Sequence, residues 1–315
     1  MKIPVIAIVG PTASGKTALA VELAKSIGGE VVSADSMQIY KGMDIATAKP
    51  TAEEMQGVPH HLIGFLDPNV PFSCPEYVRM AHTVLEDIHS RGKIPVVCGG
   101  TGLYIDSLLL NIDFGQELED TEKKREIRRV CENMSGEELL DILKKFDPEC
   151  AQRLHPNNRN RIIRAIEVYE LTGITQTEAQ RRSRLNETPY DTIWICLDYR
   201  DRQKLYGRID SRVDRMMENG LVDEARDYIS LHRDSTASQA IGYKELKPYL
   251  EGSLSLEQAS DNLKKATRHY AKRQLTWFRK NPELHRIFCD DFGSLDEIKQ
   301  QAENIIEQER EKTEE

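Results

Sequence analysis

The sequence predicts an α/β protein in which a parallel sheet is flanked by helices and interrupted by a mainly helical insertion. Three observations support this fold class. Apolar runs of strand length alternate with helical patterns, the first strand leads into a glycine-rich loop and a helix, and residues 111–189 show little strand pattern. The expected domains are therefore a core of residues 1–110 and 190–315, and an insertion of residues 111–189.

The first predicted strand, Ile3 to Val9, ends in a loop with the spacing G-x-x-x-x-G-K-T, and a helical pattern begins at Ala18. This is the context of a phosphate-binding loop (P-loop), so we expect a P-loop NTPase-like core. Backbone amides and a lysine would face a diphosphate or triphosphate, and a threonine hydroxyl would ligate Mg²⁺. The predicted diphosphate-binding residues are Gly10, Pro11, Thr12, Ala13, Ser14, Gly15, Lys16 and Thr17, with Thr17 also the predicted metal ligand.

The second buried strand, Glu30 to Ser33, is followed by Asp35. The carboxyl ends of parallel strands face the ligand crevice, so we expect Asp35 near the phosphate loop. It could bind the metal, because the later core strand from Ile94 to Cys98 ends in glycines and offers no acid. It could instead be a general base that holds a nucleophile, or a simple turn residue. The residues alone leave these three roles open.

The rest of the core continues the alternation of strands and helices. A helix is predicted over Ser73 to Arg91, and Thr101 follows the next strand, where it either caps a helix or contacts an anion. After the insertion we expect a strand over Thr192 to Leu197 and helices over residues 202–218, 221–231 and 254–278. The acidic end, residues 308–315, is expected to be frayed.

The net charge of −9 hides local basic segments. Residues 262–280 contain seven lysines and arginines, interleaved with aromatic residues, and no acid; the insertion adds basic runs at residues 122–129 and 159–164. This pattern favours contact with a polyanion over a merely solvated surface. Six cysteines without C-x-x-C spacing indicate reduced thiols, and the lack of a long apolar run or signal peptide predicts a soluble, cytoplasmic protein.

Four segments together resemble the bacterial tRNA dimethylallyltransferase family. They are G-P-T-A-S-G-K-T from Gly10, D-S-M-Q-I-Y-K-G-M-D-I-A-T-A-K-P from Asp35, G-G-T-G-L-Y from Gly99 and A-K-R-Q-L-T-W-F-R from Ala271. The similarity runs from about residue 3 to about residue 277 and departs at Ala46, where the family has glycine. It implies transfer of a dimethylallyl group from dimethylallyl diphosphate to the exocyclic amine of the adenosine 3′ to the anticodon. The implied cofactor is Mg²⁺, the partner is the tRNA anticodon arm, and the protein is expected to be a monomer.

The resemblance also assigns roles to residues. Asp35 is similar to the general base, Thr101 to the residue at the bridging oxygen of the leaving diphosphate, and Arg208 to an arginine that binds the diphosphate. Together with the basic runs, it gives the predicted tRNA-binding residues Asp35, Ser36, Met37, Gln38, Thr101, Lys123, Arg159, Asn160, Arg161, Ile162, Ile163, Gln239, Gly242, Tyr243, Lys244, Lys272 and Arg273.

Three alternative functions share parts of this pattern. A P-loop small-molecule kinase explains the phosphate loop and Asp35 but gives the basic insertion no purpose. An isopentenyl transferase acting on free adenine nucleotide needs no surface for an anticodon arm. A nucleotide-gated RNA-binding protein makes no bond. Identification of the product by mass distinguishes all of these from transfer to tRNA.

Overall fold

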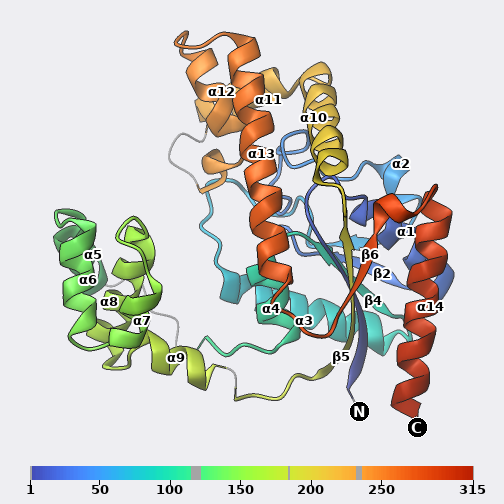
Figure 1. Cartoon of the computed structure of the whole chain (residues 1–315), viewed down its shortest axis with the longest axis horizontal. Helices are drawn as coiled ribbons and strands as arrows, with labels where there is room; N and C mark the ends of the chain where they lie inside the picture. Colours follow the sequence, from blue (N-terminus) through green and yellow to red (C-terminus); the bar gives the residue numbers. More distant parts are fainter. Residues whose placement is uncertain (1, 115–121, 184, 232–235, 315) are drawn as a thin grey trace. The chain divides into compact units, whose positions relative to one another are not determined.

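The core of the molecule is a parallel sheet (Figure 1). The structure is a computed structural model and describes residues 2–114, 122–183, 185–231 and 236–314. Within these ranges the sheet has six strands in the order β3-β2-β4-β1-β5-β6. The strands are β1 (Ile3–Val9), β2 (Glu30–Ser33), β3 (His60–His61), β4 (Pro95–Gly99), β5 (Tyr190–Asp198) and β6 (Leu284–Phe288). The sheet and its helices confirm the predicted fold class.

Both faces of the sheet are covered by helices, because the side chains of β1 alternate between two apolar clusters. Ile6 and Ile8 face a cluster formed with α1 (Lys16–Ile27) and α14 (Leu295–Glu314). Val5, Ala7 and Val9 face the opposite cluster, which includes α3 (Cys74–Ser90) and α4 (Gly102–Leu109). Burial on both faces explains why the central strands are continuous apolar runs.

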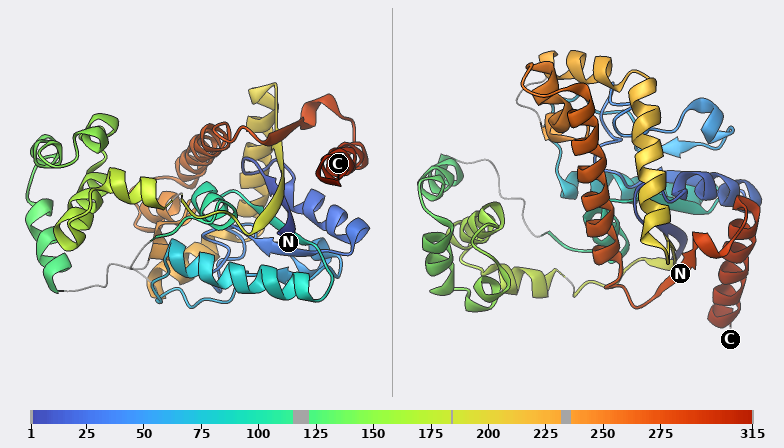
Figure 2. Two further views of the ribbon diagram at one scale, coloured as in Figure 1. Left: turned by 90° about the horizontal axis from the view of Figure 1, so that it is seen from below. Right: turned by 45° about the horizontal axis from the view of Figure 1, so that its top comes forward.

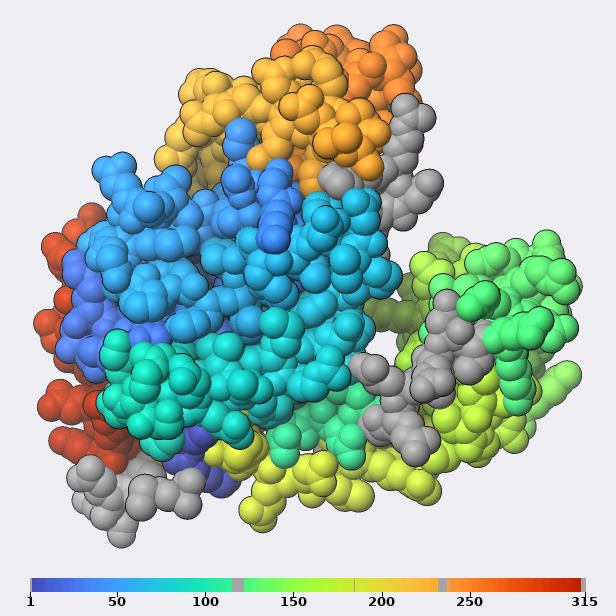
Figure 3. Space-filling model, turned by 180° about the vertical axis from the view of Figure 1, so that it is seen from behind, coloured from blue at the N-terminus to red at the C-terminus, as the bar shows by residue number. Residues whose placement is uncertain are grey.

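A group of helices extends from the core around a third apolar cluster. It contains α10 (Arg202–Glu218), α11 (Leu221–Leu231), η1 (Thr236–Gln239), α12 (Tyr243–Leu250) and α13 (Leu256–Phe278). Helices α10 and α13 run side by side in both views of Figure 2. Seen from behind, the light-blue segment that follows β2 fills the surface between the cyan atoms of α3 and the orange atoms of this group (Figure 3). The shorter elements α2 (Ala52–Met55) and η2 (Cys289–Asp291) complete the core.

The insertion is a separate compact unit of residues 110–188, and the core unit comprises residues 1–109 and 189–315. Each boundary lies one residue from the expected one. The insertion contains α5 (Glu122–Glu132), α6 (Gly136–Lys144), α7 (Pro148–Arg153), α8 (Arg159–Thr172) and α9 (Gln176–Arg182). Its own apolar cluster is built around Leu139, Leu143 and Ile162, each of them 0% exposed. A core of this kind makes the insertion a domain in its own right.

Two parts of the C-terminal region go beyond what the sequence predicted. Strand β6 was not predicted, because Leu-His-Arg-Ile-Phe mixes polar and apolar residues and pairs only with β5. Helix α14 continues into the acidic end as far as Glu314, and its earlier residues Ala302, Ile305 and Ile306 are buried in the cluster that contains α1. Across the described residues, no helix combines the length and apolar character that crossing a membrane requires.

Candidate active site

The phosphate loop connects β1 to α1 with unusual backbone angles. Gly10 has a φ of 141°, and a Cβ there would lie 2.5 Å from the carbonyl oxygen of Leu197, so only glycine fits. Ala13 also has a positive φ, of 63°. Helix α1 begins at Lys16, and Gly15 before it has no side chain to cap the helix. The first amides of α1 therefore remain available to an anion.

Cationic side chains lie at this loop, among them Lys16, Arg208 and Arg212. Lys16 Nζ donates a hydrogen bond to the Pro11 carbonyl at 2.6 Å, and burial lowers the pKa of Lys16 to about 8. Arg208 Nε donates to the Ala13 carbonyl at 2.9 Å, so the predicted arginine does reach the loop from α10. Arg212, one turn further along α10, lines the same groove, and burial lowers its pKa. The sequence reasoning missed Arg212, although its spacing of four residues from Arg208 puts both on one helix face.

Two adjoining hollows meet at the phosphate loop. A wide groove is lined by residues 13–18 together with Arg208, Arg212 and Arg215. A narrower cavity is lined by Lys16 and Thr17 on one side and by Asp35 and Gln38 on the other. Arg212 borders both hollows. The structure thus brings Asp35 to the phosphate loop, as the strand order predicts.

Asp35 forms a turn after β2. Its Oδ1 accepts hydrogen bonds from the backbone N–H groups of Met37 at 2.9 Å and Gln38 at 3.3 Å. Among the described residues, none donates a hydrogen bond to its Oδ2. The turn role that the sequence left open is therefore real, and one carboxylate oxygen is still available for a ligand in the cavity.

Thr101 joins the end of β4 to the Asp35 turn. Its Oγ1 accepts a hydrogen bond from the Ser36 N–H at 3.0 Å and donates one to Ser36 Oγ at 3.3 Å. The hydroxyl thus binds Ser36, whereas the backbone carbonyl of Thr101 accepts from the N–H groups of Tyr104 and Ile105. Thr101, which follows the cavity residue Gly100, is therefore joined through Ser36 to Asp35, which lines the cavity.

The loop after Tyr40 is held by one carboxylate on α11. Glu224 accepts hydrogen bonds from three successive backbone N–H groups, those of Asp44 at 2.9 Å, Ile45 at 2.7 Å and Ala46 at 2.9 Å. The Tyr243 hydroxyl donates to the same carboxylate at 2.9 Å. Gln38 holds the far end of the loop by donating to the carbonyls of Thr47 and Ala48. Residues 47, 48 and 50, which line the cavity, are thereby fixed in place.

Some residues predicted to bind tRNA have buried side chains in this structure. Tyr243 is 0% exposed, and Ile162 and Ile163 are 0% and 4% exposed in the insertion core, so their side chains face other residues rather than a ligand. Gly242 is also buried, and its N–H donates to Glu245. The Arg159 guanidinium donates to the carbonyls of Met134, Cys131 and Glu132, at the end of α5. That contact explains the arginine as a helix cap.

Other predicted residues lie at the surface. Asn160, Arg161, Lys244, Lys272 and Arg273 are exposed, and Ser36, Met37 and Thr101 are partly exposed. Lys123 is exposed and donates to the Glu170 carbonyl at 2.8 Å. Gln239 ends the η1 turn.

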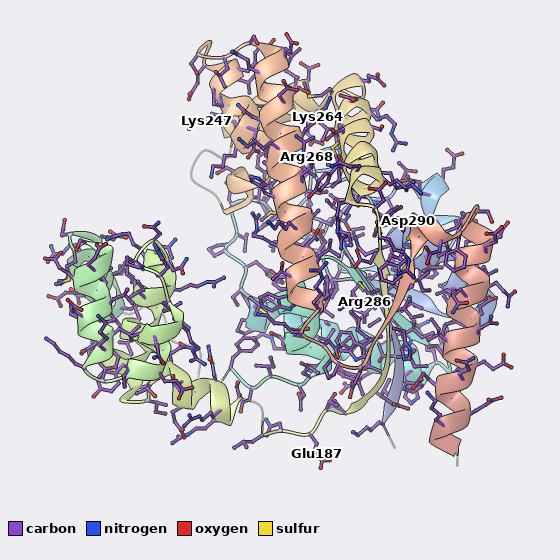
Figure 4. All side chains as sticks on the ribbon, viewed as in Figure 1. Glu187, Lys247, Lys264, Arg268, Arg286 and Asp290 are labelled. Carbon is purple, nitrogen blue, oxygen red and sulfur yellow. The ribbon has the colours of Figure 1, made fainter. Side chains whose placement is uncertain are left out.

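Helix α13 divides its basic residues between two sides. Lys264 pairs with Asp214 at 2.5 Å and Arg268 with Asp210 at 2.7 Å, both acids on α10. Both basic residues are labelled on α13, beside α10, in Figure 4. Lys272 and Arg273 are exposed further along, and the Arg273 guanidinium lies 5.5 Å from the centre of the Tyr270 ring. Lys265 is exposed as well, so the positive charge that α13 offers to solvent lies at Lys265 and, further along, at Lys272 and Arg273.

The fold and these hollows define a P-loop protein with an acidic residue at the end of the second strand, beside the loop. The sequence matches the family model described as IPP transferase over residues 38–281, and that described as isopentenyl transferase over residues 3–63. The tRNA dimethylallyltransferase of Caldanaerobacter subterraneus subsp. tengcongensis is 47% identical over 310 residues, which cover 98% of each chain. The chain belongs to the tRNA dimethylallyltransferase family, which confirms the resemblance.

Further relatives and solved structures agree. The tRNA dimethylallyltransferase of Acetivibrio thermocellus is 46% identical and covers 93% of this chain and 94% of its own. The crystal structure of tRNA delta(2)-isopentenylpyrophosphate transferase from Staphylococcus epidermidis has a TM-score of 0.72 at 42% identity, covering 98% of this chain and 100% of that one. A eukaryotic dimethylallyltransferase acting on tRNA has a TM-score of 0.78 at 32% identity, covering 91% and 74%. These similarities favour a prenyltransferase enzyme over a kinase.

Proposed function

We propose that this enzyme transfers the dimethylallyl group of dimethylallyl diphosphate to the exocyclic amine of the adenosine 3′ to the anticodon of tRNA. The observation that carries the proposal is that Lys16 and Asp35 line one cavity. A leaving diphosphate and an attacking amine have to be held this close together for a direct transfer. The relatives are named tRNA dimethylallyltransferase, which supports transfer of a dimethylallyl group to tRNA.

The diphosphate would occupy the loop of residues 10–17. Negative charge grows on it as the bond to the allylic carbon breaks, and the amides of the loop, Lys16, Arg208 and Arg212 supply fixed positive charge there. Arg208 and Arg212 approach from α10, on the groove side of the loop. Thr101, which directly follows the cavity residue Gly100, would contact the bridging oxygen.

The residues present fit a magnesium ion that arrives with its substrate. Thr17 borders both hollows and offers a hydroxyl oxygen, which is a ligand that Mg²⁺ accepts. No group of three or more acidic, histidine or cysteine side chains in the described part of the chain forms a metal site. Thr17 would thus hold the ion together with diphosphate oxygens, and the ion would supply neutralisation of the leaving group.

Asp35 would act on the acceptor. The amine of adenosine is a weak nucleophile, so a carboxylate that accepts its hydrogen bond orients it and takes its proton as the new C–N bond forms. The C–O bond to diphosphate breaks in the same event, and the electron pair leaves with the diphosphate. The Asp35 turn keeps the carboxylate fixed while this happens, because its other oxygen binds two backbone amides.

The tRNA would bind through exposed basic residues and reach the cavity by base flipping, because a stacked base cannot present its amine to the allylic carbon. Lys272, Arg273 and Lys244 offer charge on the core, and Lys123, Asn160 and Arg161 offer polar groups on the insertion. Ser36, Met37 and Gln38 would contact the flipped nucleotide. We further propose that the enzyme acts in the cytoplasm, as a monomer.

The test is to incubate the protein with dimethylallyl diphosphate and Mg²⁺, offering either tRNA or adenosine monophosphate as acceptor. We expect tRNA to gain the mass of one dimethylallyl group, with release of diphosphate, and the free nucleotide to stay unmodified. Transfer to the nucleotide alone would contradict the proposal in favour of the free-nucleotide transferase. Consumption of ATP with phosphorylation of a small acceptor would favour the kinase.

A further inference from the structure

Gln274 is a polar side chain buried where three segments of the core meet. It lies on α13 and is 5% exposed. Its amide reaches the phosphate loop and the turn after β4, and it lines the cavity shared by Lys16 and Asp35. A buried amide has to satisfy both its donor and its acceptor groups, so its contacts are specific.

The two hydrogen bonds fix which way the amide points. The Thr12 N–H donates to Gln274 Oε1 at 2.8 Å, and Gln274 Nε2 donates to the Gly100 carbonyl at 3.0 Å. A backbone N–H only donates and a carbonyl only accepts, so oxygen must face Thr12 and nitrogen must face Gly100. Neither a carboxylate nor a thioether of similar size can make both bonds.

Gly100 leaves the space that this arrangement needs. A Cβ at Gly100 would lie 2.1 Å from Gln274 Nε2, which is closer than any contact allows. Thr101 follows directly, and its N–H is bonded to the Ala34 carbonyl at 3.2 Å. The amide of Gln274 thus sets the separation between the phosphate loop and the turn that carries Thr101.

We propose that Gln274 is a positioning residue for prenyl transfer, which rests on the function proposed above. It holds the loop that binds the diphosphate and the turn beside the acceptor at the distance that the reaction needs. Gln274 contacts the backbone of Thr12 and Gly100 rather than the reacting atoms. Its loss therefore slows the chemical step more than it weakens tRNA binding. Lys272 and Arg273, which would bind tRNA, precede it on the same helix.

The experiment compares Gln274→Glu and Gln274→Met with the matched control Asn262→Asp. Glutamate retains an acceptor for Thr12 but sets a carboxylate oxygen against the Gly100 carbonyl, and methionine removes both bonds at similar volume. Asn262 is an exposed amide on the same helix, so its change to aspartate controls for added negative charge. For each protein we would measure kcat, KM for tRNA, the thermal midpoint and the affinity for inorganic diphosphate.

We expect both Gln274 variants to lose about 10-fold to about 100-fold in kcat and several-fold in diphosphate affinity, with KM for tRNA within about threefold of wild type. Asn262→Asp should match wild type. A kcat within about twofold of wild type in either folded variant would overturn the proposal. So would a loss that disappears when rates are expressed per folded enzyme, since that indicates a purely structural role. If wild type makes no prenylated tRNA, the proposed function fails instead.

Discussion

The two oxygens of the Asp35 carboxylate can serve different purposes. Oδ1 is committed to the backbone of Met37 and Gln38, whereas no described residue donates to Oδ2. Substitution of Asp35 by alanine cannot separate its role in the turn from its proposed role as general base, because alanine removes both carboxylate oxygens. Asparagine keeps an oxygen for the turn and removes only the basic carboxylate.

We therefore predict that Asp35→Asn lowers kcat by about 100-fold or more without a large change in thermal midpoint. Asp35→Ala should show the same loss of turnover and a lower midpoint. Asp67→Asn is the matched control, because Asp67 caps an exposed turn through the Asn69 N–H at 2.9 Å. Turnover of Asp35→Asn within a few-fold of wild type would leave Asp35 as a turn residue only.

A second prediction concerns Lys16, whose pKa burial lowers to about 8. The side chain is protonated below that pH and neutral above it, and only the protonated form attracts an anion. We expect diphosphate affinity to weaken as pH rises from about 7 to about 9, through the pKa of the free enzyme. Lys16→Arg stays charged throughout, so it reports the titration of diphosphate itself. Parallel pH profiles for the two proteins would contradict the prediction.

At the scale of elements, α11 acts on the active site through one side chain. Glu224 holds the N–H groups of residues 44–46, and the same loop continues to residues 47, 48 and 50 in the cavity wall. Glu224 thus connects the helix group to the loop after β2, which belongs to the segment from Asp35 to Pro50 that resembles the family. Ala46, which departs from the family pattern, makes its backbone contact as its neighbours do.

We predict that Glu224→Gln loosens this loop. An amide presents one oxygen and one NH₂ group, so at least one backbone N–H would face another donor and lose its bond, at a cost of about 1 to 2 kcal/mol. Turnover should fall about tenfold, because the cavity wall is no longer fixed, and trypsin should cleave faster after Lys41, which is followed by Gly42. Asp227→Asn, an exposed change on α11, is the control. Unchanged cleavage would show that the clamp is dispensable.

Elements with strong local signals could be predicted from the sequence. The bounds of β2, α10 and α11 agree with expectation, and the phosphate loop is a local motif. Gln274 could not be found in this way, since only tertiary packing brings α13 to that loop, whereas Arg212 could have been inferred from its four-residue spacing from Arg208 on α10. The burial of the Ile162 and Ile163 side chains in the insertion core could not be foreseen from the resemblance either. A resemblance carried by a segment does not tell which side chains of a helix face its core.

At the scale of the whole molecule, the net charge of −9 does not indicate where a nucleic acid could bind. The surroundings of each basic residue do. Lys264 and Arg268 are neutralised by acids on α10, whereas Lys272 and Arg273 are exposed on the same helix. The chain therefore supplies two pairs of equal charge in different surroundings. Only the exposed pair is free to replace counterions on a nucleic acid.

We predict that Lys272→Gln with Arg273→Gln weakens tRNA binding and reduces the slope of log affinity against log salt by about one unit or less per residue. Lys264→Gln with Arg268→Gln should leave the slope unchanged. Turnover at saturating tRNA should change little in the first pair, because phosphate contacts position the tRNA without touching the reacting centre. Equal slopes in wild type and the first pair would mean that tRNA binds elsewhere.

The insertion also determines the order in which the sheet can be completed during synthesis. Strand β1 lies between β4 and β5, but β5 follows β4 in the chain only after the whole insertion. Ribosomes add about 5 to 20 residues per second, so strands β1 to β4 are made on the order of 5 to 20 s before β5, which pairs with β1. During that time the open edge of β1 is the part of the nascent protein most exposed to wrong pairing. The insertion, with an apolar cluster of its own, can fold in the same interval.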